Sequence, residues 1–219
     1  MRLHLKLTAN TEQIPFNYQH QLTGVLHKWL GENDLHDKIS LYSFSWLRGK
    51  AERAEKGLNF PHGASLFISF WEDEYSKELI KGILKEPSLF KGMQVKEVQI
   101  QEAPDFGNAN YFKVASPVLL RLNLDDGSRK HLTTEDKEAN DLLNRRMQSK
   151  MLQANLSSRI KLRFDEKYLN PKTKLVDIKG IKLRANICPI YIEGDEEALK
   201  FAWTVGVGEL TGSGLGALI

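Results

Sequence analysis

The six histidines are the residues of this 219-residue chain best suited to moving protons. A histidine side chain has an unperturbed pKa of about 6.5, so it can act as a base or an acid at neutral pH. His20 and His27 are seven residues apart, about two turns on nearly the same face of a helix. Taken alone, each histidine is more often a surface or helix-capping residue. The six are His4, His20, His27, His36, His62 and His131.

The sequence contains no pattern of metal ligands. It has no His-Glu-x-x-His motif, no paired Asp-x-Asp loop and no Cys/His cluster at ligand spacing. The single cysteine, Cys188, excludes an internal disulfide framework and is expected to be a buried thiol. Asp125-Asp126-Gly127 is expected to be a hairpin turn, because Asp-Gly is a common turn pair. We therefore expect neither a metal nor another cofactor.

A glycine-rich segment covers residues 206–216, Gly-Val-Gly-Glu-Leu-Thr-Gly-Ser-Gly-Leu-Gly. Closely spaced glycines can take positive φ, and their N–H groups can then form an anion-binding nest. The alternative is a tight turn packed against a helix without any ligand. Glu209 argues against phosphate, and the segment lacks both the Lys of a Walker A loop and the third glycine of a dinucleotide fingerprint.

A basic segment covers residues 158–184, with nine basic side chains against three acids. Arg159, Lys161 and Arg163 alternate with apolar residues, so a strand would project all three from one face. Lys182 and Arg184 are expected to share one face of a partner strand. Such a face suits a phosphate backbone, although an ordinary solvated hairpin is the alternative. Arg145, Arg146 and Lys150 are weaker basic candidates, expected at the surface.

The elements that must position these residues follow one order in the first half of the chain. Alternation predicts strands over residues 2–8, 41–47, 65–71 and 95–100. Apolar spacing predicts one helix that ends at Gly31 and a second over 75–84. The order β-α-β-β-α-β is that of a ferredoxin-like fold. Residues 103–108 have the composition of a linker.

The second half has the same order. We expect a strand over 111–122, interrupted near Pro117, and a helix over 136–153. A strand pair follows, 160–164 with 179–187, joined by a polar loop. A short helix over 196–203 precedes the glycine-rich segment and a final strand. The prediction is an α+β protein with tandem ferredoxin-like (βαββαβ) domains and antiparallel sheets. The first, residues 1–105, carries the histidine candidates; the second, residues 111–219, carries the basic hairpin and the glycine-rich segment.

The bulk composition is that of an ordinary soluble protein, with a net charge of +3 that identifies no partner by itself. The alternating start of the chain is unlike a signal peptide, and no apolar run is long enough to cross a membrane. We expect a cytoplasmic protein without a membrane partner.

Three segments carry a resemblance to a known family. Gly206-Val-Gly208, five residues, then Gly214-Leu-Gly216 resembles the C-terminal glycine-rich motif of the CRISPR repeat-processing endoribonucleases, the sixth Cas family. That family belongs to a superfamily of repeat-associated RNA-binding proteins. Pro15-Phe16-Asn17-Tyr18-Gln19 to Gly24-Val25-Leu26-His27 is similar to its first loop and helix. Phe112-Lys113-Val114-Ala115-Ser116-Pro117-Val118 is similar to the strand that opens its second domain. The resemblance implies tandem ferredoxin-like folds.

The resemblance also implies an activity: binding of precursor CRISPR RNA and metal-independent cleavage within the repeats. The 2′-hydroxyl would attack, leaving a 2′,3′-cyclic phosphate and a 5′-hydroxyl. His27 matches the helix position of the family's catalytic residues, His36 the position in the following loop, and Lys38 the nearby lysine, with Lys50 as the alternative. Expected RNA-binding residues are Arg159, Lys161, Arg163, Lys182, Arg184, Gly206, Gly208, Gly214 and Gly216.

Two other functions stay open. One is a non-cleaving RNA-binding subunit of a CRISPR effector complex, since the superfamily includes such proteins. The other is a ferredoxin-like protein-interaction module without an RNA role. The implied partners are CRISPR repeat RNA and, as a further candidate, the effector complex, with the chain as a monomer or a homodimer.

Overall fold

The computed structural model describes residues 1–33, 35, 39–157 and 159–219. In its first half the alternating start of the chain forms β1 (Arg2–Leu7), with Leu3, Leu5 and Leu7 buried. β1 lies at the centre of an antiparallel sheet of order β3-β6-β1-β7. The other strands are β3 (Tyr42–Phe44), β6 (Ser65–Phe70) and β7 (Val95–Gln101). This is the strand order of a ferredoxin-like fold.

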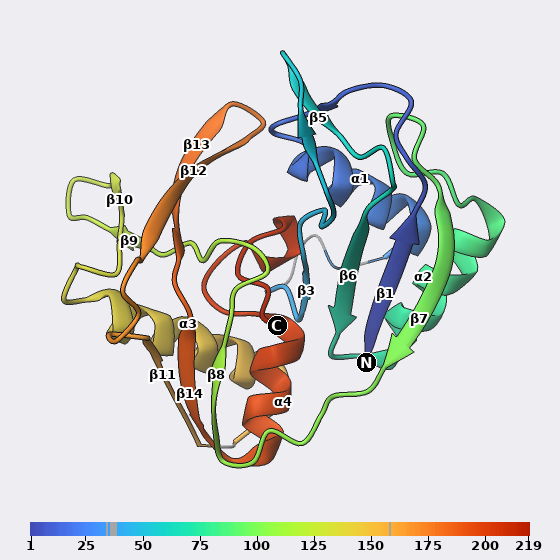
Figure 1. Cartoon of the computed structure of the whole chain (residues 1–219). Coiled ribbons are helices and arrows are strands. Elements are labelled where there is room, and N and C mark those ends of the chain that lie inside the picture. The colour runs from blue at the N-terminus through green and yellow to red at the C-terminus, as the bar shows by residue number, and fades with distance from the viewer. Residues whose placement is uncertain (34, 36–38, 158) are drawn as a thin grey trace.

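Two helices cover one face of this sheet (Figure 1). They are α1 (Gln19–Leu30) and α2 (Asp73–Lys85), whose apolar sides join the leucines of β1 in one hydrophobic cluster. A small sheet of order β2-β5-β4 extends from the same half. Its strands are β2 (Ile14–Pro15), β4 (Glu52–Arg53) and β5 (Gly57–Asn59).

The second half builds a sheet of order β11-β14-β8, again antiparallel. Its strands are β8 (Ala109–Phe112), β11 (Ile160–Phe164) and β14 (Ile190–Gly194). The end of the chain completes it: Lys113 and Ile219 exchange backbone hydrogen bonds at 3.0 and 2.8 Å. Helices α3 (Ala139–Gln153) and α4 (Glu196–Val205) pack on its apolar face. The fold class predicted from the sequence is confirmed.

The second half also contains two hairpins outside its main sheet. One joins β9 (Arg121–Asn123) to β10 (Arg129–His131), and the other joins β12 (Lys172–Ile178) to β13 (Ile181–Ile187). The predicted turn at Asp125-Asp126-Gly127 is confirmed, because Gly127 has a φ of 79° between β9 and β10. The burial of Cys188 is confirmed as well.

One predicted strand pair is wrong. Residues 160–164 do not pair with 179–187: β11 pairs with β14, while β13 pairs with β12. Both arrangements satisfy the same alternation of polar and apolar residues, so the pattern alone does not distinguish them. As a result the basic residues of β11 and β13 lie on separate surfaces. The domain limits 1–105 and 111–219 stay a prediction.

The two halves meet across α4, which lies between the two sheets (Figure 1). Arg2 is the main polar contact there, with its side chain buried between the rings of Phe67 and Trp203, 3.8 and 3.4 Å from their centres. Its guanidinium donates hydrogen bonds to the carbonyls of Trp203 and Leu218, both at 2.9 Å. Burial, together with the charge of Arg48, lowers the pKa of Arg2. The ring faces and carbonyls offset that cost of burial by solvating the cation.

We expect Arg2→Ala to lower the free energy of unfolding by about 2 to 4 kcal/mol, because it leaves two buried carbonyls without their donor and opens a gap between two rings. Urea unfolding followed by tryptophan fluorescence measures this. Lys6→Ala is the matched control on the same strand: Lys6 is exposed and pairs with Glu97 at the surface, so its loss should cost less than about 1 kcal/mol. Equal losses of unfolding free energy in the two variants would contradict the role of Arg2 as a stabilising contact between the halves.

Candidate functional site

The glycine-rich segment begins where α4 ends and lies in the junction between the halves. Gly206, Gly208, Gly214 and Gly216 all have positive φ, as predicted. A Cβ on Gly216 would lie 1.9 Å from the Val207 carbonyl oxygen, and one on Gly214 would lie 2.8 Å from the Phe44 ring. These positions therefore need glycine for close packing as well as for backbone conformation.

Most N–H groups of this segment donate to acceptors within the protein. Gly206 N donates to Ala202 O at 2.9 Å, Val207 N to Gly216 O at 2.8 Å, and Gly216 N to Pro117 O at 2.8 Å. The segment is buried apart from the partly exposed Glu209, Leu210 and Ser213. These amides do not form the exposed anion-binding nest that the sequence suggested, and the geometry supports the packing alternative. Contact of the four glycines with RNA stays a prediction.

His27 lies in the last turn of α1, next to this segment. Its Nε2 is 3.4 Å from the hydroxyl of Tyr42, which donates to the carbonyl of Gly212 at 3.2 Å. Burial raises the pKa of Tyr42 to about 12, so it is a phenol at neutral pH. Because the phenol proton is directed at Gly212, the hydroxyl oxygen can accept from His27 when Nε2 carries the proton. Tyr42 and Gly212 together orient a half-buried histidine.

The other two predicted catalytic residues, His36 and Lys38, lie outside the described residues. Ser40, which follows them in the chain, contacts the glycine-rich segment. Its carbonyl accepts from the Thr211 hydroxyl at 3.5 Å. A Cβ on Gly212 would lie 2.5 Å from the Ser40 hydroxyl oxygen. Ser40 therefore reaches the glycine-rich segment beside Gly212, the residue that accepts from Tyr42. Lys50, the alternative lysine, is exposed near the hairpin that carries β4.

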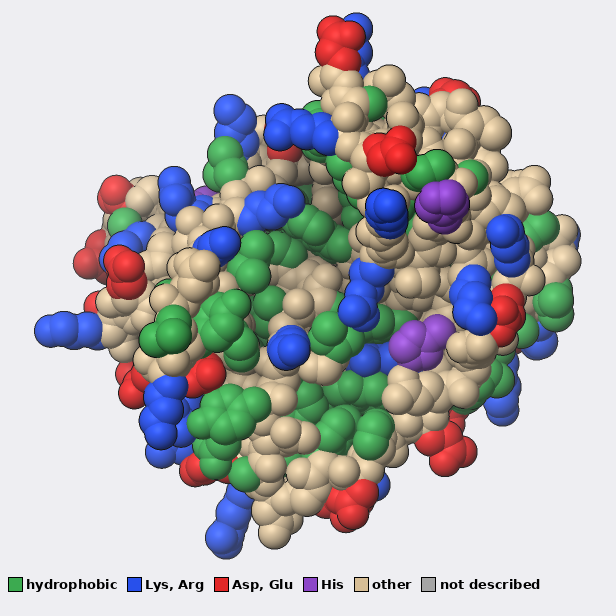
Figure 2. Space-filling model, viewed as in Figure 1, with side chains coloured by type: hydrophobic (Ala, Val, Ile, Leu, Met, Phe, Trp, Pro, Cys, Tyr) green, Lys and Arg blue, Asp and Glu red, His purple; other side chains and the backbone are tan. Residues whose placement is uncertain are grey.

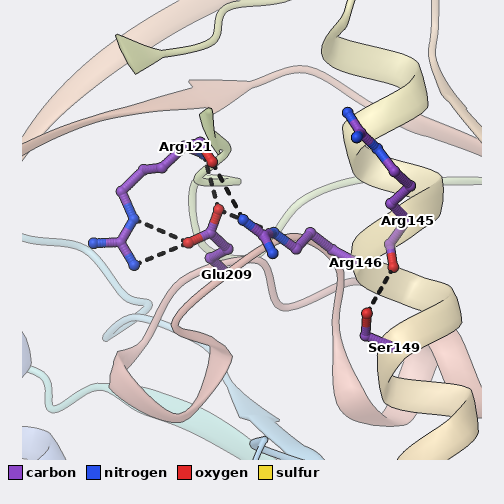
Figure 3. A network of polar contacts seen from close by, with 5 residues as sticks. All are labelled: Arg121, Arg145, Arg146, Ser149 and Glu209. Atoms are coloured by element: carbon purple, nitrogen blue, oxygen red, sulfur yellow. Dashed lines mark hydrogen bonds and ion pairs between the residues drawn. The ribbon is translucent and has the colours of Figure 1, made fainter. Parts of the chain in front are cut away.

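A pocket of about 300 Å³ opens beside Ser40, lined by α3 and residues 208–211. Glu209 joins two arginines there: its Oε2 is 2.9 Å from Arg121 Nη2, and its Oε1 is 3.2 Å from Arg146 Nε (Figure 3). Arg145 points away from this network, while Ser149 donates to its carbonyl at 3.0 Å. Two cations against one carboxylate leave this wall of the pocket net positive. Sequence reasoning missed the network because its members are 63 and 88 residues apart.

Lys150 is not the surface residue expected from the sequence. Its side chain is buried, and its Nζ lies 3.1 Å from the carbonyls of Val205 and Gly206 and from the Thr211 hydroxyl. Burial lowers the pKa of Lys150 to about 7. The lysine links α3 to the end of α4 and to Thr211, and so stabilises the shape of the glycine-rich segment.

The basic residues predicted to bind RNA occupy two surfaces. On β11, Lys161 and Arg163 project from the face opposite the buried Leu162 and Phe164, as their alternation predicted. Arg159 precedes this strand and is exposed. On β13, Lys182 and Arg184 are exposed and alternate with buried residues. They share one face, but on a hairpin that projects from the fold (Figure 1).

A larger cleft of about 630 Å³ separates this hairpin from the first half of the chain. Figure 2 shows it as a hollow in which hydrophobic side chains are edged by lysine and arginine. Lys174 Nζ lies 4.8 Å from the ring centre of Trp46, and the Arg53 guanidinium lies 5.5 Å from that of Phe16. Aromatic faces beside cations suit a nucleic-acid strand. The sequence did not reveal this cleft, because its two walls are more than 100 residues apart.

Among the residues that the structure describes, no three His, Cys, Asp or Glu side chains come together in a way that could hold a metal ion. None of the described helices is both long and apolar enough to cross a bilayer.

This chain is similar to known proteins in sequence and in fold. The family model for the C-terminal part of CRISPR-associated protein Cas6 matches residues 100–218. CRISPR-associated endoribonuclease Cas6 1 of Methanocaldococcus jannaschii is 26% identical, with 100% of this chain and 92% of the relative covered. A putative CRISPR-associated endoribonuclease-like protein Cas6 of Pyrococcus furiosus is 27% identical, with 99% and 97% covered.

Solved structures agree on the fold. The structure of a Cas6-related gene product from Pyrococcus furiosus has a TM-score of 0.87 at 23% identity and covers 100% of this chain and 97% of its own. A structure described as an RAMP protein binding different RNA substrates has a TM-score of 0.81 at 21% identity and covers 100% and 99%. At these identities the similarity extends to the fold and no further.

Lys150 gives this site a testable dependence on pH. Its folded pKa of about 7 lies below the ordinary lysine value of 10.5, so between these values the unfolded chain binds more protons and stability rises with pH. The stability that deprotonated Lys150 contributes is fully present above the unfolded pKa of 10.5 and is lost as the pH falls toward the folded pKa of about 7. Lys150→Met removes it. We expect the unfolding free energy of the wild type, minus that of the variant, to increase from pH 7 to pH 10.

Lys137→Met, a change of an exposed lysine just before α3, is the matched control and should keep the wild-type slope. Urea unfolding at a series of pH values supplies all three curves. A wild-type curve parallel to that of Lys150→Met across this range would show that Lys150 keeps its charge in the folded protein.

Proposed function

This chain belongs to the Cas6 family of CRISPR-associated proteins, and on that basis we propose that it is an endoribonuclease that binds precursor CRISPR RNA and cleaves it within the repeats. The family match covers more than half of the chain and includes the whole glycine-rich segment. The observation that carries the proposal is the contact of His27 with that segment through Tyr42. A candidate acid–base residue from one half of the chain thereby meets the family's glycine-rich motif from the other.

The proposed reaction needs no metal. A base removes the proton of a 2′-hydroxyl, the 2′-oxygen attacks the adjacent phosphorus, and an acid protonates the departing 5′-oxygen. The bond from phosphorus to the 5′-oxygen breaks as the bond to the 2′-oxygen forms. The products are a 2′,3′-cyclic phosphate and a 5′-hydroxyl. We assign the two proton transfers to His27 and His36, and the stabilisation of the charged phosphate to Lys38.

The surroundings of His27 support a role in proton transfer. The imidazole is half-buried, so solvent can reach it. Its contact with the Tyr42 hydroxyl, itself held by the Gly212 carbonyl, restricts the ring to one orientation. The pocket wall formed by Arg121 and Arg146 lies across the glycine-rich segment and adds positive potential for a phosphate.

RNA binding is assigned to the two basic surfaces and the cleft. Lys182 and Arg184 project from the face of the β12–β13 hairpin opposite the buried Leu183 and Ala185, and residues 174–177 of the same hairpin line the cleft that contains Trp46. Arg159, Lys161 and Arg163 form the second surface. Cations on an exposed hairpin and on a sheet face can follow a phosphate backbone without reading bases. Capture of RNA by these surfaces would leave the chemistry to the groups around His27.

We expect His27→Ala and His36→Ala each to slow cleavage of a repeat RNA by about 10²-fold or more, because each removes a proton-transfer group. RNA affinity should change little. Single-turnover cleavage measures the rate, and fluorescence anisotropy measures the affinity. His62→Ala, a change of an exposed histidine outside the site, is the control and should cut at the wild-type rate.

Two further conditions test the chemistry. Cleavage should persist in EDTA, and a 2′-deoxy nucleotide at the cut site should block it by removing the nucleophile. If both histidine variants cut normally, the assignment of residues is wrong. If the wild type binds repeat RNA tightly and leaves it intact, the chain is instead a non-cleaving RNA-binding subunit.

We expect the double change Lys182→Gln and Arg184→Gln to weaken repeat RNA binding and to reduce its dependence on salt. The plot of log K against log salt should become shallower by about 0.7 to 0.9 for each phosphate that the protein no longer neutralises. Lys77→Gln with Lys85→Gln, on the opposite side of the molecule (Figure 1), is the matched control and should leave the slope unchanged. An unchanged slope in the hairpin variant would remove the hairpin from the RNA-binding surface.

A further inference from the structure

The second sheet has an outer face that the fold leaves open. Its inner face is covered by α3 and α4, against which Phe112, Leu162 and Ile192 are buried. Side chains alternate along strands, so the neighbouring residues point outward. On β8 and β14 these include Tyr111 and Tyr191. Because α4 lies between the two sheets, this face is on the outside of the molecule (Figure 1).

Three outward side chains form a row across the strands. In the register of the sheet Arg163 lies opposite Tyr191, and Tyr191 lies opposite Tyr111. The ring centres of the two tyrosines are 4.7 Å apart at an interplanar angle of 51°. The Arg163 guanidinium lies 4.4 Å from the centre of the Tyr191 ring. The row is therefore one contiguous surface of two aromatic faces and a planar cation.

Tyr111 is the exposed member of this row, while Tyr191 and Arg163 are half-buried, and basic residues border the row. Tyr111 is 49% exposed, which is high for a large aromatic side chain on a strand. Lys161 lies two residues before Arg163 on β11, and Lys113 lies two residues after Tyr111. Both lysines are exposed. Glu193, opposite Lys161, is an acid on the same face, and Asp195 at its edge accepts from the Arg159 amide at 2.7 Å. Figure 2 shows hydrophobic side chains over this part of the molecule, with both basic and acidic side chains around them.

We propose that Tyr111, Tyr191 and Arg163 form a stacking platform for the bases of single-stranded RNA. Four-stranded sheets with exposed aromatic side chains bind RNA by stacking unpaired bases on the rings. Here the exposed Tyr111 ring offers a face to one base, and the Arg163 guanidinium, supported by the Tyr191 ring beneath it, offers a second plane. The surrounding Lys113, Lys161 and Arg159 offer partners for the phosphates. The geometry thus accommodates a short stretch of about two or three nucleotides.

The chemistry favours an unpaired strand over a duplex. A tyrosine ring on a sheet stacks only on an exposed base face, and the bases of an A-form helix are stacked on one another. Stacking is also tolerant of sequence, because every base has a flat aromatic face. Arg163 is part of the platform as well as a cation, since a guanidinium plane can itself stack on a base.

The proposal rests in part on the proposed function, since it names a single-stranded portion of the RNA as what this face holds. It adds an element that the basic residues alone do not supply. Lys and Arg side chains bind any polyanion, duplex or single strand, whereas the two rings select RNA whose bases are unpaired. The platform would thus hold single-stranded RNA, away from the groups proposed for cleavage.

The test is binding of the full chain to a labelled, unstructured oligouridine of about 12 nucleotides, followed by anisotropy. The double change Tyr111→Leu and Tyr191→Leu should weaken binding by at least about 5-fold for each base that loses its ring. Tyr111→Phe with Tyr191→Phe keeps both rings and should bind as the wild type does. Tyr168→Leu, a change of an exposed tyrosine in the loop after β11, is the control and should also bind normally. A blunt RNA duplex should bind all four proteins equally.

Several outcomes would overturn the platform. They are a wild type that does not bind oligouridine, a leucine variant that binds it as well as the wild type, and equal losses for oligouridine and duplex. Ultraviolet cross-linking of oligouridine to the wild type gives a readout without mutation: the linked peptides should contain Tyr111 or Tyr191. Cross-links confined to other peptides would contradict the proposal even if the leucine variant proved unstable.

Cleavage of repeat RNA by the same proteins separates this proposal from the proposed function. If the wild type cuts and the tyrosine variants bind oligouridine normally, the platform fails and the endoribonuclease stands. If the wild type does not cut but its oligouridine binding depends on the two rings, the endoribonuclease fails and the platform stands.

Discussion

The structure depends on how the buried C-terminus of α4 is satisfied. A helix leaves its last carbonyls without intrahelical donors, and here that end lies between two sheets. Side chains supply the donors: Arg2 to Trp203 O, Ser43 to Thr204 O, and Lys150 to Val205 O and Gly206 O. Two of the three donors are basic side chains, which also suit the negative end of the helix dipole when they are charged. One helix end thus joins β1, β3 and α3.

This arrangement fixes where the glycine-rich segment begins and therefore what it contacts. From Gly206 the chain turns into the space between Phe44, Tyr42 and the segment of Val118 and Leu119. Lys150 holds both sides of the turn, and Trp46 donates to Gly214 O at 2.6 Å. The segment becomes a rigid wall beside α1. Its role in the site is therefore to position Tyr42 and, through it, His27.

The sequence predicted the elements that depend on local pattern and missed the contacts that depend on distant partners. Alternation and helical spacing indicated both βαββαβ units. They did not indicate the pairing of β11, because β13 and β14 have the same alternation. A local signal existed: Lys179-Gly180, with φ of 53° and 83°, is a two-residue hairpin turn that joins β12 to β13. The burial of Arg2 and Lys150 could not be predicted, since their partners lie 201 and 55 residues away.

The same constraint accounts for the separation of the proposed RNA-binding surfaces from the proposed acid–base group. The candidate acid–base group lies at the junction, where both halves of the chain restrict it and little space remains for a polymer. The basic hairpin and the outer sheet face lie away from α4, where strands can present side chains without disturbing that helix, and the cleft opens between the hairpin and the first half of the chain. In the proposed function, an RNA held on those surfaces would bring one phosphate to a rigid site that does not have to supply the binding energy itself. Surfaces that only bind can then change in sequence without altering the packing that orients His27.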